Sequence, residues 1–172
     1  MKQEEIEKVY LIKKLPADLN KCKKMIIRDG NFFDPNTVDS LRIRQKGNQY
    51  ELTKKDGKSA QQRTEHTINI KKEEFEIFWP VASWKYEKER YLYSLDNLTA
   101  EIDIYLGNLK GYARVEVEFA TEQESEKFNR PDWFGLEITD WNHTIHSDID
   151  NISFQVMQKR YQEKGIELIA IN

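Results

Sequence analysis

The sequence predicts an α+β fold built mainly from antiparallel β-strands. Three observations predict this class: charged and apolar residues alternate over many short segments, turn-forming residues separate the segments, and few stretches have helical spacing. In residues 41–55, Arg42 and Arg44 alternate with apolar residues, and the turn residues Gly47 and Asn48 follow. This pattern predicts a β-hairpin with one apolar face and one charged face.

Length and composition are typical of one globular domain, which we expect to span residues 1–172. A chain of 172 residues can bury an apolar core without disulfide bonds. Lysine and arginine total 27, and aspartate and glutamate total 30, so the formal net charge is -3. This charge gives no overall basic field that would attract a nucleic-acid polymer, so any anion site has to be local.

Cysteine usage and hydropathy predict a cytoplasmic protein. Cys22 is the single cysteine, and one thiol cannot form an internal disulfide, which favours a reducing compartment. No apolar run is long enough to cross a membrane, and the first residues, MKQEEIEK, turn acidic where a signal peptide would become apolar. We therefore expect no membrane contact, while the sequence leaves the formation of a homodimer open.

The first half of the chain is predicted to hold an opening strand, a covering segment, the hairpin and a further strand. The opening strand carries Glu5 and Glu7 on one face and ends before Pro16, because proline is disfavoured inside a sheet. The other expected elements are a short helix or covering loop over residues 17–27, turns at Asp29-Gly30 and Asp34-Pro35-Asn36, the hairpin strands of residues 41–55, a polar loop over residues 56–59 and a strand over residues 61–70.

The second half is predicted to alternate strands with short helices. Residues 71–79 have helical spacing, with Glu73 and Glu74 near the start, where the helix dipole favours them, and Pro80 at the end. The other expected elements are strands over residues 84–93, 99–106 and 112–119, turns or loops at 96–97 and 107–111, a helix over 122–129, a short strand over 137–139, an amphipathic C-terminal helix ending near Gly165 and an apolar tail over 166–171 with the potential to add a strand.

Charged residues occupy one face of each predicted strand and are sorted by sign. A solvated sheet face usually mixes charges and avoids like charges in neighbouring rows. Arginine forks suit phosphate oxygens, whereas paired carboxylates suit hard divalent cations. In chain order the charged faces carry Glu5 and Glu7; Arg42 and Arg44; Lys55; Arg63 and Glu65; Lys88 and Arg90; Glu101 and Asp103; and Arg114, Glu116 and Glu118.

Two arrangements of these strands agree with the pattern. If one antiparallel sheet closes on itself with the charged faces inward, its lumen has a basic wall and an acidic wall. Such a lumen suits a polyphosphate with a bound Mg²⁺ or Mn²⁺, because the cationic side chains hold phosphates while carboxylates hold the metal that orients a water. An open sheet with a solvated charged face would show the same alternation, so the pattern alone leaves both open.

The order and spacing of several short motifs resemble those of the CYTH superfamily, the triphosphate tunnel metalloenzymes. The similarity runs from Glu5 to about Thr139, and each motif is weak alone. The motifs are Glu5-x-Glu7, Leu41-Arg42-Ile43-Arg44, Leu52-Thr53-x-Lys55, Arg63-x-Glu65, Lys88-x-Arg90, Glu101-x-Asp103, Glu116-x-Glu118 and Trp133-Phe134-Gly135-Leu136-Glu137-Ile138-Thr139.

This resemblance implies an eight-stranded closed β tunnel barrel with flanking helices and a C-terminal helix. For the small bacterial branch it implies Mg²⁺- or Mn²⁺-dependent hydrolysis of triphosphates, often inorganic triphosphate. Other branches hydrolyse thiamine triphosphate or cyclise ATP to cyclic AMP, as class IV-type adenylate cyclases do. The partner implied is therefore a small triphosphate or polyphosphate.

The resemblance also implies roles for the charged residues. The implied catalytic residues are Glu5, Glu7, Glu65, Glu116 and Glu118. The implied phosphate-binding residues are Arg42, Arg44, Lys55, Arg63, Lys88, Arg90 and Arg114. The implied metal ligands are Glu5, Glu7, Glu101, Asp103, Glu116 and Glu118.

Three positions depart from the family pattern. Val9 stands where the opening motif has a lysine, and Thr67 stands where the Arg63 motif has a second glutamate. Arg114 adds a cation that can replace the lost lysine in charge but not in position. The two losses leave a second function open, that of a protein that binds a polyphosphate or nucleotide with reduced catalysis.

Overall fold

Nine strands form one antiparallel sheet in the computed structural model, which describes residues 6–32, 40–59, 62–141 and 152–171, without the side chains of 55–59 and 62–65. The sheet order is β5-β4-β3-β2-β6-β7-β8-β1-β9. The strands are β1 (Ile6–Ile12), β2 (Lys23–Asn31), β3 (Ser40–Lys46), β4 (Gln49–Ser59), β5 (Gln62–Asn69), β6 (Trp84–Leu95), β7 (Leu98–Tyr105), β8 (Ala113–Phe119) and β9 (Phe134–Glu137).

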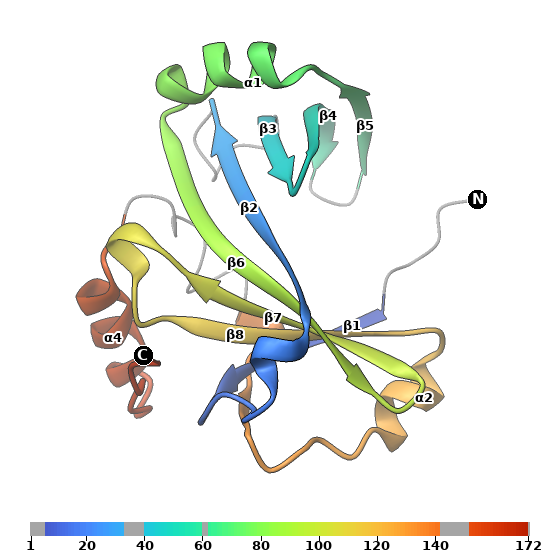
Figure 1. Ribbon diagram of the computed structural model, residues 1–172, viewed down its shortest axis with the longest axis vertical. Coiled ribbons are helices and arrows are strands. Elements are labelled where there is room, and N and C mark those ends of the chain that lie inside the picture. Colours follow the sequence, from blue (N-terminus) through green and yellow to red (C-terminus); the bar gives the residue numbers. More distant parts are fainter. Residues whose placement is uncertain (1–5, 33–39, 60–61, 142–151, 172) are drawn as a thin grey trace.

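Short helices lie at the ends of the sheet. Figure 1 shows the long strands β2 and β6 joining an upper part, with β3, β4 and β5, to a lower part, with β7, β8 and β1. Helix α1 (Lys72–Phe78) lies above the upper part, whereas α2 (Glu122–Lys127) and α4 (Phe154–Gln162) lie at opposite ends of the lower part (Figure 1). Local capping fixes where these helices begin: Thr121 Oγ1 accepts a bond of 3.1 Å from the Glu124 N–H, and the Lys71 N–H donates to Glu74 at 2.6 Å.

The register of the sheet places the charged residues of successive strands on one face, which we name the charged face. Arg42 lies opposite Thr53, and Arg44 lies opposite both Glu51 and Asp29. Directly opposed residues of antiparallel strands point to the same side. The same rule groups further charged residues across β6, β7 and β8: Lys88, Arg90, Glu101, Asp103, Arg114 and Glu116.

Two apolar clusters stabilise this arrangement. One covers the opposite face of the lower sheet, where Ile102, Val115 and Val117 are fully buried. The other lies at one end of the charged face itself, where Val9 and Tyr105 pack in the same cluster as residues of α4. The members of this second cluster are Val9, Leu11, Tyr105, Leu109, Tyr112, Ile138, Ile152, Phe154, Met157, Tyr161 and Leu168. Helix α4 therefore covers one end of the charged face with apolar side chains.

The predicted hairpin is confirmed, and the predicted covering segment is wrong. The hairpin is β3 and β4, with Gly47 at a φ of +60° in the turn. Residues 23–31 form β2, an interior strand, and not a helix or loop ending in a turn at Asp29-Gly30. Gly30 serves close packing, because an added Cβ would lie 3.0 Å from the Cβ of Ala82. The predicted turn at Asp34-Pro35-Asn36 lies outside the described residues.

The predicted fold class is confirmed, whereas closure of the sheet into a barrel is not observed among the described residues. An antiparallel sheet with flanking helices is confirmed, but it has nine strands and not eight, because β2 was not expected as a strand. Among the described residues β5 and β9 are edge strands, and no ladder joins them. The predicted polar loop over residues 56–59 belongs to β4, and the described tail over 166–171 forms no strand.

No helix in the described ranges combines the length and the apolar character needed to span a lipid bilayer.

Candidate active site

A buried network of ion pairs joins β6, β7 and β8 on the charged face. Arg90 donates from Nε and Nη2 to the two carboxylate oxygens of Asp103, at 2.6 and 2.7 Å. Lys88 Nζ lies 2.5 Å from the same carboxylate. Arg90 also bonds to Glu116 at 2.9 Å and to Glu101, and Arg114 bonds to Glu116 at 2.5 Å. The network therefore joins cations of β6 and β8 to carboxylates of β7 and β8.

Burial makes this network electrostatically strong. Asp103 is 0% exposed and Lys88 is 3% exposed. Burial acts to raise the pKa of Asp103, but Lys88 and Arg90 outweigh it and hold that pKa below its ordinary value. Burial also lowers the pKa of Lys88, although Asp103 favours its charged form. We conclude that Asp103 is ionised.

A second buried ion pair lies on β2 and β3. Arg44 donates from Nε and Nη2 to the two oxygens of Asp29, at 2.6 and 2.9 Å, and the Tyr86 hydroxyl donates to Asp29 Oδ2 at 2.7 Å. Asp29 is 0% exposed. Sequence reasoning missed Asp29 because it placed a turn there, and it did not single out Tyr86 within the predicted strand over residues 84–93. The signal that could have found Asp29 is its spacing of two residues from Ile27 and four from Met25, which places all three on the same side of a strand.

Arg42 lies next to this ion pair, but its Nε, unlike that of Arg44, has no described hydrogen-bond partner. It is two residues from Arg44 on β3 and points to the same face. Its Nε is buried and has no hydrogen-bond partner among the described residues. A buried N–H donor without an acceptor is unfavourable, and such an atom is a signal of a missing ligand.

Five of the predicted phosphate-binding residues come together on the charged face: Arg42, Arg44, Lys88, Arg90 and Arg114. The backbones of the other two, Lys55 on β4 and Arg63 on β5, are described, and Lys55 lies opposite Glu65. The side chains of Lys55, Arg63 and Glu65 lie outside the described part of the structure, so the geometry of these three predicted residues stays untested.

The predicted acidic residues fall into two groups. Glu101, Asp103 and Glu116 bind Arg90. Glu7 on β1 and Glu118 on β8 lie directly opposite each other and are both exposed. Glu5 lies outside the described residues. In the described ranges, no group of three or more Asp, Glu, His or Cys side chains is arranged to hold a metal ion.

The two departures from the family pattern have structural explanations. Val9 is fully buried in the apolar cluster beside α4, so an apolar side chain takes the place of the missing lysine. Val9 lies opposite Glu116, whose carboxylate is bound by Arg90 and Arg114. Arg90 on β6 and Arg114 on β8 therefore supply the cations in this part of the charged face. Thr67 shares a hydrogen bond of 2.9 Å with Thr53 across β4 and β5, in place of a second acid.

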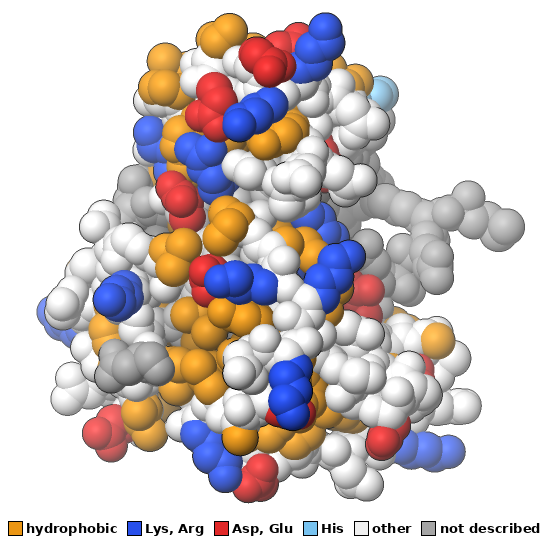
Figure 2. Space-filling model, viewed as in Figure 1, with side chains coloured by type: hydrophobic (Ala, Val, Ile, Leu, Met, Phe, Trp, Pro, Cys, Tyr) orange, Lys and Arg blue, Asp and Glu red, His pale blue; other side chains and the backbone are white. Residues whose placement is uncertain are grey.

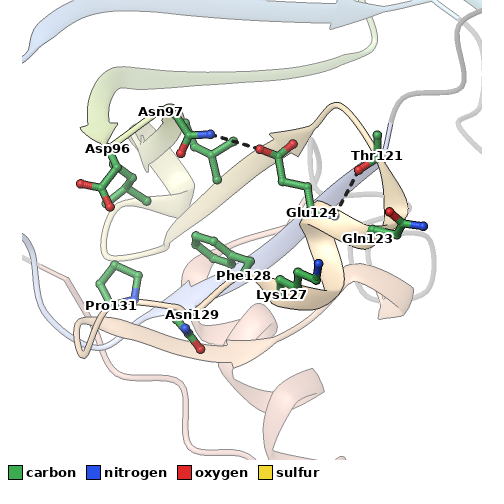
Figure 3. Close-up of a pocket in the computed structure, with 11 residues that line it drawn as sticks. Asp96, Asn97, Thr121, Gln123, Glu124, Lys127, Phe128, Asn129 and Pro131 are labelled. Carbon is green, nitrogen blue, oxygen red and sulfur yellow. Dashed lines mark hydrogen bonds between the residues drawn. The ribbon is translucent and has the colours of Figure 1, made fainter.

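The charged face is distinct from the surface hollows. Figure 3 shows a groove of about 610 Å³ between the β6–β7 turn and α2, lined in part by Asn97, Glu124, Lys127 and Phe128. It contains none of the predicted site residues. Figure 2 shows acidic and basic side chains interspersed on the face in view, without a single broad basic field. On the face in view, therefore, no broad basic field competes with the charged face as an anion site.

Comparisons with known proteins find relatives that cover most of the chain. The CYTH domain family matches residues 31–147. An inorganic triphosphatase of Nitrosomonas europaea is 34% identical over 166 residues, covering 95% of this chain and 97% of that protein. An inorganic triphosphatase of Acetivibrio thermocellus is 29% identical over 148 residues, covering 84% of this chain and 92% of that protein. A crystal structure of an inorganic triphosphatase has a TM-score of 0.71 and 31% identity, covering 87% of this chain and 95% of that chain.

Proposed function

This chain belongs to the CYTH domain family, and on that premise we propose that it is a metal-dependent triphosphatase acting on a small triphosphate, with inorganic triphosphate as the first candidate. Two relatives of nearly the same length carry the name inorganic triphosphatase, which supports the reaction class. The observation that carries the proposal is the buried Nε of Arg42, which has no acceptor among the described residues. A phosphate oxygen is the acceptor that best suits a guanidinium group.

The cationic residues hold the phosphate chain in this proposal. Arg42 and Arg44 lie two residues apart on the same face of β3, so both guanidinium groups can reach one bound anion. Lys88 and Arg90 lie further along the face and share the carboxylate of Asp103. Because Asp103 fixes their positions before an anion arrives, less conformational entropy is lost on binding.

Carboxylates on the same charged face suit a hard divalent ion. Glu7 and Glu118 are exposed and directly opposed, so their carboxylates lie on the same side of the sheet, and carboxylate oxygens are the ligands that hard divalent ions prefer. Magnesium sites of this class commonly use one or two carboxylates together with substrate phosphates, so no cage of three acids is required. We assign Glu7 and Glu118, with Glu116 beside them, to hold Mg²⁺ or Mn²⁺. When bound, the ion neutralises phosphate charge and lowers the pKa of a water.

We also propose that the sheet curves around a channel with the charged face inside. Burial supports this: Asp103 and Lys88 are almost completely removed from solvent, whereas a charged face open to water would leave such side chains exposed. The apolar cluster at α4 covers one end of the face, so the phosphate chain enters from the other end. Exclusion of water from such a site strengthens each charge–charge contact.

A substrate panel tests the proposal. Purified protein is incubated with inorganic triphosphate, ATP or thiamine triphosphate, in Mg²⁺, in Mn²⁺ and in EDTA, and both phosphate release and cyclic AMP are measured. We expect rapid, metal-dependent phosphate release from inorganic triphosphate. Cyclic AMP from ATP would identify a cyclase instead. Tight triphosphate binding without turnover would identify a binding protein, the outcome that Val9 and Thr67 leave open.

A further inference from the structure

We propose that Asp29 is a positioning residue that orients the guanidinium group of Arg44 toward the bound phosphate. This inference rests on the proposed function, because it assumes that the charged face binds a triphosphate. Asp29 lies outside every motif of the sequence and comes from β2, a strand that the sequence did not predict. Its carboxylate contacts Arg44 and Tyr86, and its role is exerted through Arg44.

The described contacts of Arg44 occupy one edge of its guanidinium group. A guanidinium group carries five N–H donors in a planar fork. Asp29 occupies the edge formed by Nε and Nη2, at 2.6 and 2.9 Å. The remaining donors, on the Nη1 side, therefore point in a fixed direction. The Arg44 side chain is 30% exposed while the Asp29 side chain is almost completely buried, so the edge of Arg44 that Asp29 does not occupy faces accessible space.

Tyr86 fixes the carboxylate in turn. Its hydroxyl donates to Asp29 Oδ2 at 2.7 Å, so that oxygen accepts from both Tyr86 and Arg44. Tyr86 itself packs beside Tyr105 with ring centroids 5.8 Å apart, in the cluster that includes α4. The chain of contacts thus runs from the apolar cluster through Tyr86 and Asp29 to Arg44. Such support of a binding side chain by buried neighbours preserves its orientation within a fraction of an ångström.

Arg42 provides an internal comparison. It is on the same strand and the same face, but its Nε has no partner among the described residues. Asp29 therefore fixes Arg44 through two hydrogen bonds, whereas the Nε of Arg42 is left to bond to the ligand. A purely stabilising ion pair is the alternative, but a buried pair is weak evidence for stability, because desolvation offsets much of the attraction. The two readings differ in what they predict for anion binding.

A charge-preserving mutant cycle separates these readings. Binding of inorganic triphosphate is measured by calorimetry in EDTA for Arg44→Lys, alone and together with Asp29→Asn, so that no result depends on turnover. Lysine keeps the charge of Arg44 but cannot form the fork. We expect Arg44→Lys to weaken triphosphate binding about fivefold or more in the wild-type background. In the Asp29→Asn background we expect the same substitution to weaken binding less than about twofold. The matched control is Arg42→Lys, which we expect to weaken binding equally in both backgrounds.

The outcomes are distinct. Equal losses for Arg44→Lys in both backgrounds would overturn the positioning role, even if Asp29→Asn lowers the melting temperature. If Asp29→Asn does not fold, Tyr86→Phe replaces it as the background, because Tyr86→Phe retains every formal charge. The effect of Arg44→Lys on triphosphate affinity should then shrink at least about twofold. An unchanged effect would again overturn the positioning role. Failure of the wild-type protein to bind triphosphate would instead overturn the proposed function.

Discussion

The guanidinium group of Arg90 on β6 binds both oxygens of Asp103 on β7, at 2.6 and 2.7 Å, and the two residues lie directly opposite each other in the sheet. This pair joins a predicted phosphate-binding residue to a predicted metal ligand. The basic and acidic residues of the lower sheet are therefore interleaved across strands and do not form two separate walls. On β3, the buried Nε of Arg42 has no hydrogen-bond partner among the described residues.

Arg42→Ala should weaken binding of inorganic triphosphate by about tenfold to a hundredfold, because a charge-assisted hydrogen bond contributes about 1.5–3 kcal/mol. The melting temperature should change little, since the Nε of Arg42 bonds to no described protein group. Calorimetry in EDTA measures the first quantity and thermal unfolding the second. Lys14→Ala is the control, because Lys14 forms an exposed ion pair with Asp132, away from the charged face. Unchanged affinity in Arg42→Ala would remove Arg42 from the site.

Glu118→Gln should raise the Mg²⁺ concentration required for half-maximal turnover by about tenfold or more, because the substitution removes one charged oxygen ligand. Binding of triphosphate in EDTA should stay the same or tighten, since a negative charge is lost from the charged face. Glu122→Gln is the matched control, an exposed acid in the first turn of α2. A metal requirement that is the same in Glu118→Gln and Glu122→Gln would contradict this assignment.

Asp103→Asn should lower the free energy of unfolding by about 3–5 kcal/mol, because it leaves buried cations without their counter-ion. Lys88 is 3% exposed and bonds to Asp103 at 2.5 Å, so it has no access to water that could replace the carboxylate. Urea unfolding followed by circular dichroism measures this change. Asp132→Asn, at an exposed ion pair, should have almost no effect. A loss no larger than that of Asp132→Asn would show that Asp103 is not a buried counter-ion.

The stability difference between the wild type and Asp29→Asn should depend on pH only in acid. Burial acts to raise the pKa of Asp29, but Arg44 outweighs burial and holds it below the ordinary value of 3.8. A carboxyl group with a depressed pKa stabilises the fold fully above its unfolded-state pKa and loses that contribution as pH falls below it. The difference should be constant from about pH 7 to pH 5 and should narrow below about pH 4. If the stability difference narrows already above about pH 5, its pH dependence would come from the titration of a group other than Asp29.

The hairpin of β3 and β4 was predictable because its determinants are local. Arg42 and Arg44 alternate with apolar neighbours, and Gly47 supplies the positive φ that the turn requires. Strand β2 was not predictable in the same way. Asp29 and Gly30 resemble a turn, yet Gly30 is needed because η2 (Trp79–Val81) approaches β2, and Ala82 and Trp79 lie far along the chain. A contact of that kind leaves no local pattern.

The sequence by itself determined the alternation of charged and apolar residues, and with it the antiparallel strands and the set of side chains that share one face. It could not determine which of those side chains meet. The binding of Arg90 to Asp103, the contact of Arg44 with Asp29 and the lack of a described partner for the Arg42 Nε depend on strand register and burial. Only the tertiary structure decided them, because the strength of a charge pair depends on distance and on exclusion of water, which are set by residues distant in the chain.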